Sequence, residues 1–581
     1  MLHDEFVTNE ERLMEPVIER RAPASVMRLA RLGSLHQSRL SFMRILLRRM
    51  QSEQWTFSCP EFVVDERGVG RAVMCAHGPE NTYSLVAFFH DLPAYQRSDR
   101  VIAEAWDATF TLVDGIPTEE DIKRLSRNVP LQEAGRVSER ELSLSRANRS
   151  VRLWEHVVDS LANGEQPDTE YLHSVGYLMR TTAVYGSGKF GAADREVIEH
   201  RPEFKAPFQV EMLTVYLIRA LTKDLVQAVA SAQAKRLGRA TAAVLEPTVA
   251  QSLGIGNSTG LGMAPFLLNH PVLLNNWLQV REEALVRVRR LPSASADEVD
   301  RFRELLSRGI QALEEWKSNH PLQQEKLVSL KSDARRLLAY VNQADFQNDY
   351  PWNRLQLWAE KNLDIDAQEY LVSMLFEPYG ELVDNLADEL SANEDLHLID
   401  GGMQVSSLCH EIRARYDWAL TIDWNLPDSH NYVWYTSAEK LEPRLGERQV
   451  EALDAYEQPL SPARDISALY DALVEFPSEE TIARFLIQQP EHRHAVRRVQ
   501  LLRDAPYGEI RDNTIGAELL PIDLLRCKLA FFGATRFDPR SDRWVRICLF
   551  DGAPYPQQLA NSDAQYWPYP LVVGSTSHSN V

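Results

Sequence analysis

The stretch Arg180–Gly191, RTTAVYGSGKFG, contains two threonines, a serine, three glycines and a lysine in twelve residues. Glycines beside small hydroxyl residues let several backbone N–H groups converge on one anion, and a nearby lysine or arginine neutralises its charge. The spacing matches neither a Walker A loop nor a GxGxxG turn. We therefore predict an anion-binding loop between two helical segments. The structural alternative is a strand-to-helix turn with Lys189 in solvent.

The residues of this stretch differ in the chemistry that they offer. Arg180 and Lys189 are predicted to bind the anion, and Tyr185 is a candidate for acid–base catalysis. The remaining predicted contacts are hydroxyl groups and glycine backbone groups, which come from Thr181, Thr182, Gly186, Ser187 and Gly188.

A second stretch of unusual composition, GIGNSTGLG at 254–262, interrupts a long region with a helical pattern. Its polar residues Asn257, Ser258 and Thr259 precede an apolar run, so they are expected to present N–H groups at a helix start. His270 follows closely and is the second acid–base candidate. The alternative is a kinked helix whose polar groups satisfy one another. We predict that the two stretches border one pocket, because buried backbone groups at element ends need partners.

Composition restricts the classes of function. Lys and Arg number 63 against 83 Asp and Glu, which gives a net charge of −20 and disfavours nucleic acid as a partner. No apolar run approaches the roughly 18 residues that span a membrane, and the charged amino terminus does not look like a signal peptide. We therefore expect a cytoplasmic protein with no membrane partner.

The five cysteines include no CxxC pair, and no histidines have the His-x-x-x-His spacing of a helical metal site. No metal site is predicted, and the sequence identifies no cofactor.

The apolar periodicity changes along the chain. Two β-rich runs, 71–77 and 82–90, flank a turn, and a third run at 108–113 precedes a helix capped by Thr118. Most of 148–179 and nearly all of 208–396 have a helical pattern. Further strands are predicted at 418–424, 431–436, 528–535 and 543–550.

The two ends of the chain share short similar segments. DGIPTEEDIKRL at 114–125 resembles VEFPSEETIARFL at 474–486, and 178–195 resembles 524–543 in the same order. These similarities suggest an internal duplication, with chance similarity of helix caps as the alternative.

Together these patterns predict a predominantly helical α+β fold, in which two α+β lobes with small antiparallel sheets flank a helical middle. The expected domains are an amino-terminal lobe at 1–205, a helical domain at 206–400 and a carboxy-terminal lobe at 401–581, a degenerate repeat of the first if the duplication holds.

The leading functional hypothesis is a cytoplasmic metabolic enzyme that binds a small anionic, phosphate- or carboxylate-bearing substrate or cofactor at the Gly/Ser/Lys loop. The competing hypothesis is a non-catalytic interaction or scaffold protein that uses its helical middle domain. Long amphipathic helices in an acidic chain of this size also favour a homo-oligomer.

Overall fold

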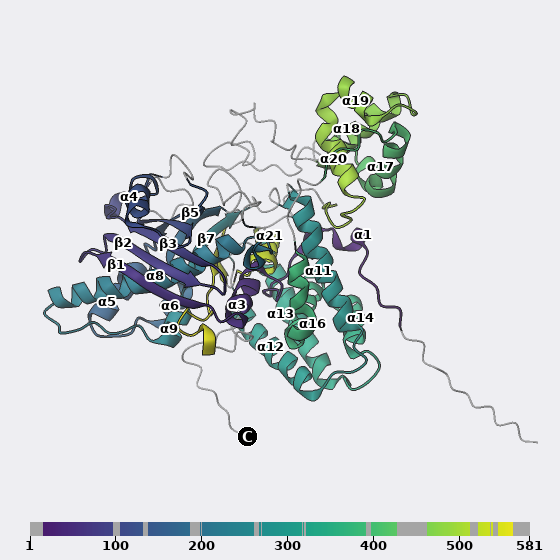
Figure 1. Cartoon of the computed structure of the whole chain (residues 1–581). Coiled ribbons are helices and arrows are strands. Elements are labelled where there is room, and N and C mark those ends of the chain that lie inside the picture. Colours follow the sequence, from purple (N-terminus) through teal and green to yellow (C-terminus); the bar gives the residue numbers. More distant parts are fainter. Residues whose placement is uncertain are drawn as a thin grey trace, which may run out of the picture.

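The computed structural model of the chain describes residues 16–96, 105–131, 138–185, 198, 200–260, 267–268, 270–316, 318, 321–390, 397–426, 462–511, 521–534, 536–538 and 544–561. These residues form one mixed β-sheet, helices that pack against it, a larger helical region beside it, and a small group of helices set apart (Figure 1).

The sheet has nine strands in the spatial order β1-β2-β3-β4-β5-β6-β7-β9-β8. Eight neighbouring pairs connect them. β6 and β7 are parallel, whereas all the other pairs are antiparallel. The strands are β1 Thr56–Val64, β2 Gly70–His77, β3 Thr82–Phe89, β4 Ala108–Asp114, β5 Glu141–Arg149, β6 Tyr177–Tyr185, β7 Gly254–Gly260, β8 Arg536–Asp538 and β9 Trp544–Leu549.

Local sequence explains the first four strands well. β2 and β3 pair through the turn after His77, as the two β-rich runs predicted, and β4 confirms the third run. Thr118 then caps the next helix: its side chain accepts from the Asp121 N–H while the Asp121 side chain accepts from the Thr118 N–H. This reciprocal pair satisfies two backbone donors at the helix start.

The α-helices around the sheet and beyond it have the following bounds: α1 Pro23–Val26, α2 Leu29–Leu32, α3 Phe42–Ser52, α4 Glu119–Asn128, α5 Trp154–Ala162, α6 Thr169–Val175, α8 Gln209–Arg236, α9 Pro247–Gln251, α11 Pro271–Arg289, α12 Ala296–Glu315, α13 Pro321–Gln343, α14 Pro351–Asn362, α15 Ile365–Met374, α16 Gly380–Val383, α17 Val405–Leu420, α18 Pro462–Glu475, α19 Ile482–Gln488, α20 Arg493–Leu501 and α21 Pro521–Cys527. Helix α8 packs against strands β2 to β7, and α5 packs against α8.

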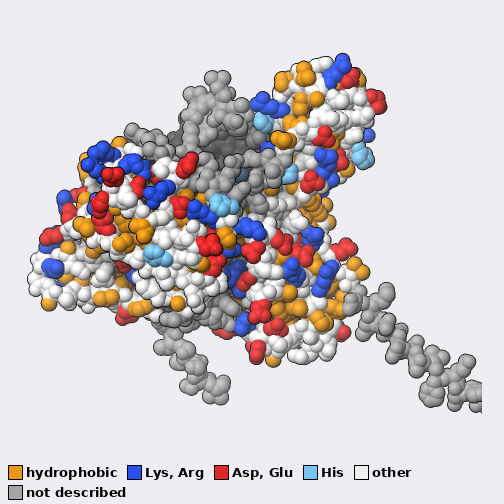
Figure 2. Space-filling view, in the orientation of Figure 1, with side chains coloured by type: hydrophobic (Ala, Val, Ile, Leu, Met, Phe, Trp, Pro, Cys, Tyr) orange, Lys and Arg blue, Asp and Glu red, His pale blue; other side chains and the backbone are white. Residues whose placement is uncertain are grey.

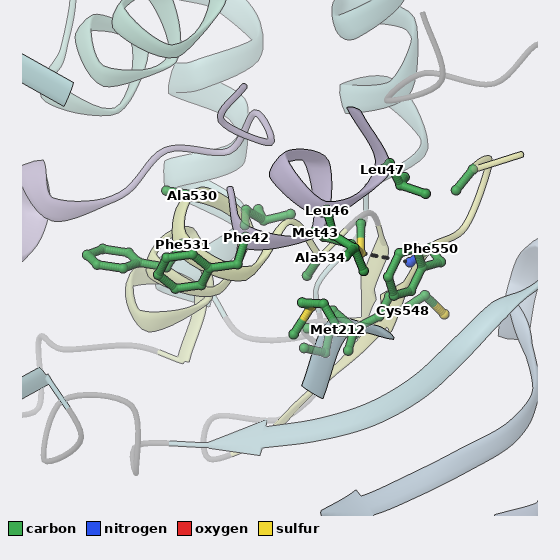
Figure 3. Close-up of a cluster of buried hydrophobic side chains, with 14 of the residues drawn as sticks. Phe42, Met43, Leu46, Leu47, Met212, Ala530, Phe531, Ala534, Cys548 and Phe550 are labelled. Carbon is green, nitrogen blue, oxygen red and sulfur yellow. Dashed lines mark hydrogen bonds between the residues drawn. The ribbon is translucent and has the colours of Figure 1, made fainter. Parts of the chain in front are cut away.

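One hydrophobic core joins the sheet, α8 and the region from α11 to α16. Figure 3 shows a part of this core where Phe42 and Met43 of α3 meet Phe531 and Phe550, which lie about 500 residues later in the chain. The Phe550 N–H donates to the Met43 sulfur at 3.2 Å. The amino-terminal helices and the carboxy-terminal strands therefore belong to the same packed unit.

Helices α17 to α20 have a hydrophobic core of their own, which includes Leu408, Ile412, Leu469 and Phe485. These helices stand apart from the sheet in Figure 1. Basic and acidic side chains are interspersed over the described surface on the face shown in Figure 2.

The predicted fold class was wrong. The protein has one nine-stranded sheet, and two small antiparallel sheets do not flank a helical middle. Strands from the first, second and last thirds of the chain meet in that sheet, because β7 pairs with β6 on one side and β9 on the other. Such long-range pairing leaves no periodic signal in the sequence. The domain boundaries 1–205, 206–400 and 401–581 stay a prediction.

Several element predictions were also wrong for a common reason. The predicted strand 418–424 begins within α17, where Tyr416 and Ala419 contact the helical core. The predicted strand 528–535 begins with a π-helical turn, Lys528–Phe532, and the helical prediction for 148–179 misses β6. Short apolar runs fit either a strand or a buried helix, and tertiary packing decides between them. The predicted strand 431–436 lies outside the described residues.

The duplication receives no support from the described residues. Helix α4 follows strand β4, whereas α19 follows helix α18. The cap of α19 is Thr481, three residues after Ser478, the serine that the alignment matched to Thr118. The two Pro-hydroxyl-Glu-Glu segments therefore differ in which residue caps the helix and in the element that precedes it.

No described helix combines the length and the apolar character that crossing a membrane requires.

Candidate functional site

The parallel pair β6 and β7 brings the two stretches of the sequence prediction into neighbouring strands. Arg180 of β6 lies opposite Gly256 of β7, and Met179 lies opposite Ile255. Because parallel strands run in the same direction, the chain leaves the sheet at the same edge after Tyr185 and after Gly260. The parallel pairing covers Tyr177–Arg180 of β6 and Gly254–Gly256 of β7, and the site candidate is the edge toward which both strands continue beyond it, to Tyr185 and to Gly260.

Arg180 and Thr181 lie inside the protein. Arg180 is buried in the middle of the sheet, between Asn148 of β5 and Gly256 of β7. Thr181 is buried as well, and its hydroxyl donates to the Gly256 carbonyl at 3.4 Å. Arg180 therefore places a positive charge within the sheet, at the last pair of the parallel β6–β7 register and five residues before the end of β6.

In β7, Asn257 is half-buried and lies opposite Ile547 of β9. Ser258 and Thr259 continue the strand opposite Arg546 and Val545. Residues 254–260 form an extended strand, and residues 261–266, where the expected helix start would follow, lie outside the described residues.

Two glycines of this stretch have structural roles. A Cβ on Gly256 would lie 2.6 Å from the Tyr177 ring, and a Cβ on Gly254 would lie 2.4 Å from the Leu549 carbonyl. Real Cβ atoms do not approach neighbours so closely, so both positions require glycine for strand packing. Strand packing thus explains both glycines without a ligand.

The structure describes only some of the other residues that were predicted to contact the ligand. Thr182 and Tyr185 belong to β6 by their backbone, with Tyr185 as its last residue opposite Leu144. Gly186, Ser187, Gly188 and Lys189 lie outside the described residues.

His270 lies at the amino end of α11, as its N-cap residue. Burial lowers the pKa of the His270 imidazole below its ordinary value of 6.5. The ring is therefore mainly neutral at pH 7, the form that accepts a proton.

The polar groups on the β5 side of Arg180 support the backbone. The Asn148 side chain accepts from the Asp107 N–H at 2.8 Å, and the Asp107 carboxylate accepts from the Arg149 N–H at 2.9 Å. The Arg146 guanidinium lies 4.2 Å from the ring centre of Trp106. These contacts order the strands next to Arg180.

Arg219 of α8 is buried and has a structural role. Its guanidinium donates to the Leu253 carbonyl at 2.7 Å and lies 3.9 Å from the ring centre of Tyr555. Arg219 thus fixes the chain immediately before β7.

Lys528 is a residue with functional potential that the sequence reasoning missed. It begins the π-helical turn, a geometry that is often found at functional sites. Its ammonium lies 4.7 Å from the Phe532 ring centre, and burial lowers the pKa of this amine to about 8. The local sequence CKLAFFG carries a weak signal, a lysine within an apolar run.

Among the described residues, no group of three or more His, Cys, Asp and Glu side chains is arranged to hold a metal ion. Comparison of the chain with protein-family models, with curated proteins and with solved structures found no match.

Proposed function

We propose that the protein is a metabolic enzyme that binds a small anionic substrate or cofactor where β6 and β7 end. The observation that supports this proposal is the single parallel pair in an otherwise antiparallel described sheet. Ligands often bind at the carboxyl ends of parallel strands. Where the loops that follow two adjacent strands run in different directions, they leave a crevice between them. In the sequence, Gly186–Lys189 directly follows one of these ends.

The residues at this edge offer complementary chemistry. Arg180 and Lys189 would neutralise a carboxylate or phosphate, and Thr181, Thr182, Ser187, Ser258 and Thr259 would supply hydroxyl donors. Asn257 adds an amide, and the backbone of Gly186 and Gly188 adds N–H groups. Tyr185 or His270 would transfer the proton, and the lowered pKa of His270 favours the neutral form that acts as a base.

A cytoplasmic location and a homo-oligomeric state belong to the same proposal. They rest on the acidic composition and on the long helices of the middle region, of which α8 has 28 residues and α13 has 23. Sedimentation velocity of the full chain tests the oligomeric state.

The competing proposal is a scaffold protein that uses the helical region. It is favoured by exposed apolar side chains there, including Val328 of α13 at 67% and Leu357 of α14 at 43% exposure. A scaffold would not need a small ligand at the ends of β6 and β7.

The test is a thermal-shift screen of the full chain with small carboxylates, phosphate esters, nucleotides and acyl-CoA. A ligand at 100 times its Kd stabilises the folded state by about 2.7 kcal/mol, which such a screen detects. We expect Lys189→Ala to abolish the shift and to leave the melting temperature without ligand nearly unchanged. Lys361→Ala, at an exposed position on α14, is the matched control.

Two results would refute the enzyme proposal. One is that no compound in the screen stabilises the protein. The other is that Lys189→Ala lowers the melting temperature of the ligand-free protein strongly, which would show a structural role for this lysine.

A further inference from the structure

A cavity of about 510 Å³ lies against helix α3, between it and the 3-10 helix Asp384–Glu389. This volume falls within the range of small-molecule pockets, roughly 300–1,000 Å³. Three arginines and three carboxylates line it: Arg39, Arg48, Arg49, Glu53, Asp384 and Asp388. The charges of this lining are distributed unevenly between its two ends.

At the first end, two guanidinium groups share one carboxylate. Arg39 donates to both Asp384 oxygens, each at 2.7 Å, and Arg48 approaches the same carboxylate at 3.2 Å. Arg48 also donates to the Arg39 carbonyl at 2.7 Å. Two positive charges against one negative charge leave this end with one unit of positive charge.

The charges behind this end do not remove that excess. Arg44 donates to Glu377 at 2.7 Å and Arg39 lies 3.8 Å from the same carboxylate, so three guanidinium groups face the two carboxylates Glu377 and Asp384. His36 contacts Glu377 at 2.8 Å, but burial lowers the pKa of its imidazole and favours the neutral ring. The first end therefore keeps its positive charge.

The ionisation of Arg48 reflects the same environment. Burial, together with the neighbouring charges of Arg39 and Arg44, outweighs Asp384 and lowers the pKa of the Arg48 guanidinium to about 9. Arginine remains protonated in proteins near neutral pH. Burial and the neighbouring arginines disfavour the charged form of Arg48, and an anion bound beside this guanidinium would stabilise that form.

At the second end the balance is reversed. Arg49 approaches Asp388 at 2.9 Å and Glu53 at 3.4 Å, so two carboxylates face one guanidinium. The carboxyl end of α3 lies here too, and the helix dipole adds partial negative charge. Arg49 and Glu53 are four residues apart, about one helical turn or roughly 5 Å along the axis.

We propose that this pocket binds a compact organic zwitterion, with its oxyanion against Arg39 and Arg48 and its ammonium group against Glu53 and Asp388. The separation of charge along the pocket favours such a ligand over a simple anion or a simple cation, because each of those would meet a repulsive end. This site is separate from the proposed function at β6 and β7 and does not depend on it.

Isothermal titration calorimetry of the full chain tests the proposal with three probes of matched length: 4-aminobutanoate, butanoate and butylamine. We expect 4-aminobutanoate to bind at least about tenfold more tightly than either single-charge probe, because only it pairs with both ends. Equal affinity for 4-aminobutanoate and butanoate, or no binding of any probe, would overturn the proposal.

Variants locate the binding. Asp388→Asn changes an exposed side chain and is expected to reduce the preference for 4-aminobutanoate over butanoate to about twofold or less. Arg48→Gln is expected to weaken binding of 4-aminobutanoate and of butanoate. Asp300→Asn, at an exposed ion pair with Arg303, is the matched control and should change neither affinity. An unchanged preference in Asp388→Asn would place the ligand elsewhere and contradict the proposal.

Discussion

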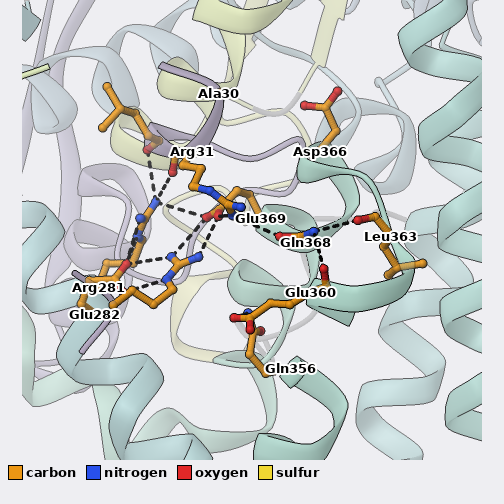
Figure 4. Close-up of polar contacts among 12 residues, drawn as sticks. Ala30, Arg31, Arg281, Glu282, Gln356, Glu360, Leu363, Asp366, Gln368 and Glu369 are labelled. Atoms are coloured by element: carbon orange, nitrogen blue, oxygen red, sulfur yellow. Dashed lines mark hydrogen bonds and ion pairs between the residues drawn. The ribbon is translucent and has the colours of Figure 1, made fainter. Parts of the chain in front are cut away.

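Two buried charge clusters in the helical region resemble each other in composition and differ in enclosure. The enclosed cluster comprises Arg21, Arg31, Arg281, Glu282 and Glu369 (Figure 4). The pocket cluster comprises Arg39, Arg44, Arg48, Glu377 and Asp384. Each cluster has three guanidinium groups and two carboxylates, so each has one excess positive charge.

In both clusters the guanidinium groups also donate to neutral acceptors, and the clusters differ in how far solvent reaches their carboxylates. Arg281 donates to the Arg31 carbonyl at 2.8 Å, and Arg31 donates to the Gln368 side chain at 3.1 Å. Glu282 is fully buried and accepts from both Arg21 and Arg281. In the pocket cluster Asp384 is 29% exposed, so solvent or a ligand can reach it. The same set of charges is therefore closed off from solvent in one cluster and opens on a cavity in the other.

The enclosed cluster also explains how the amino-terminal segment is held. Arg21 lies in a region with only short helices and donates to Glu282 of α11 and to Glu369 of α15. The ion pairs thus connect residues more than 250 positions apart.

The largest expected effect comes from removing one carboxylate of the enclosed cluster. Glu282→Gln leaves Arg21, Arg31 and Arg281 with Glu369 as the one carboxylate of the cluster, and this loss of a buried counter-charge should cost about 3–5 kcal/mol of unfolding free energy. Urea denaturation followed by circular dichroism measures this loss. Glu283→Gln is the matched control: it is the next residue of α11, is one-third exposed, and should change stability by less than about 1 kcal/mol. Similar losses in the two variants would show that enclosure is not the cause.

A smaller effect is expected from acid. Burial alone would raise the pKa of Glu282, but the charges and hydrogen bonds of Arg21 and Arg281 outweigh it and lower the pKa from 4.5 to about 2. Below pH 4.5 the unfolded chain binds a proton at this carboxyl that the folded chain does not bind. This contribution to stability is therefore complete above pH 4.5 and is lost as the pH falls towards 2.

Urea midpoints measured at a series of pH values test this expectation. The wild type should lose more stability on acidification than Glu282→Gln, because the amide does not titrate. An equal loss in both proteins would assign the acid sensitivity to other carboxyls.

The smallest effect is expected in the pocket cluster. Asp384→Asn removes the counter-charge of Arg39 and Arg48 but leaves a partly solvated site, so we expect a loss of about 1–2 kcal/mol. Thermal denaturation at low and moderate salt measures it, and added anions should recover part of the loss. A loss as large as that of Glu282→Gln would contradict the distinction between the clusters.

Prediction from sequence succeeded for elements whose structure is determined by residues close to one another in the chain. The strands β2 and β3, the cap at Thr118 and the strand β9 depend on alternation, turn residues and a hydroxyl next to a helix start, all of which lie within a few residues. The candidate site was predictable only in part. Arg180, Thr181 and Asn257 were identified by residue type, but their strand conformation was not, since glycines and small hydroxyl residues in both stretches are typical of loops.

The sequence by itself determined which residues carry charge, hydroxyl groups and conformational freedom, because these are properties of the side chains. It also determined the short elements whose hydrogen bonds close locally. Only the tertiary structure decided that β7 lies between β6 and β9, that Arg21 meets Glu282, and that α3 borders a pocket lined by arginines and carboxylates. These contacts join residues far apart in the chain, and their free energy depends on burial and on neighbouring charges that appear only when the chain is folded.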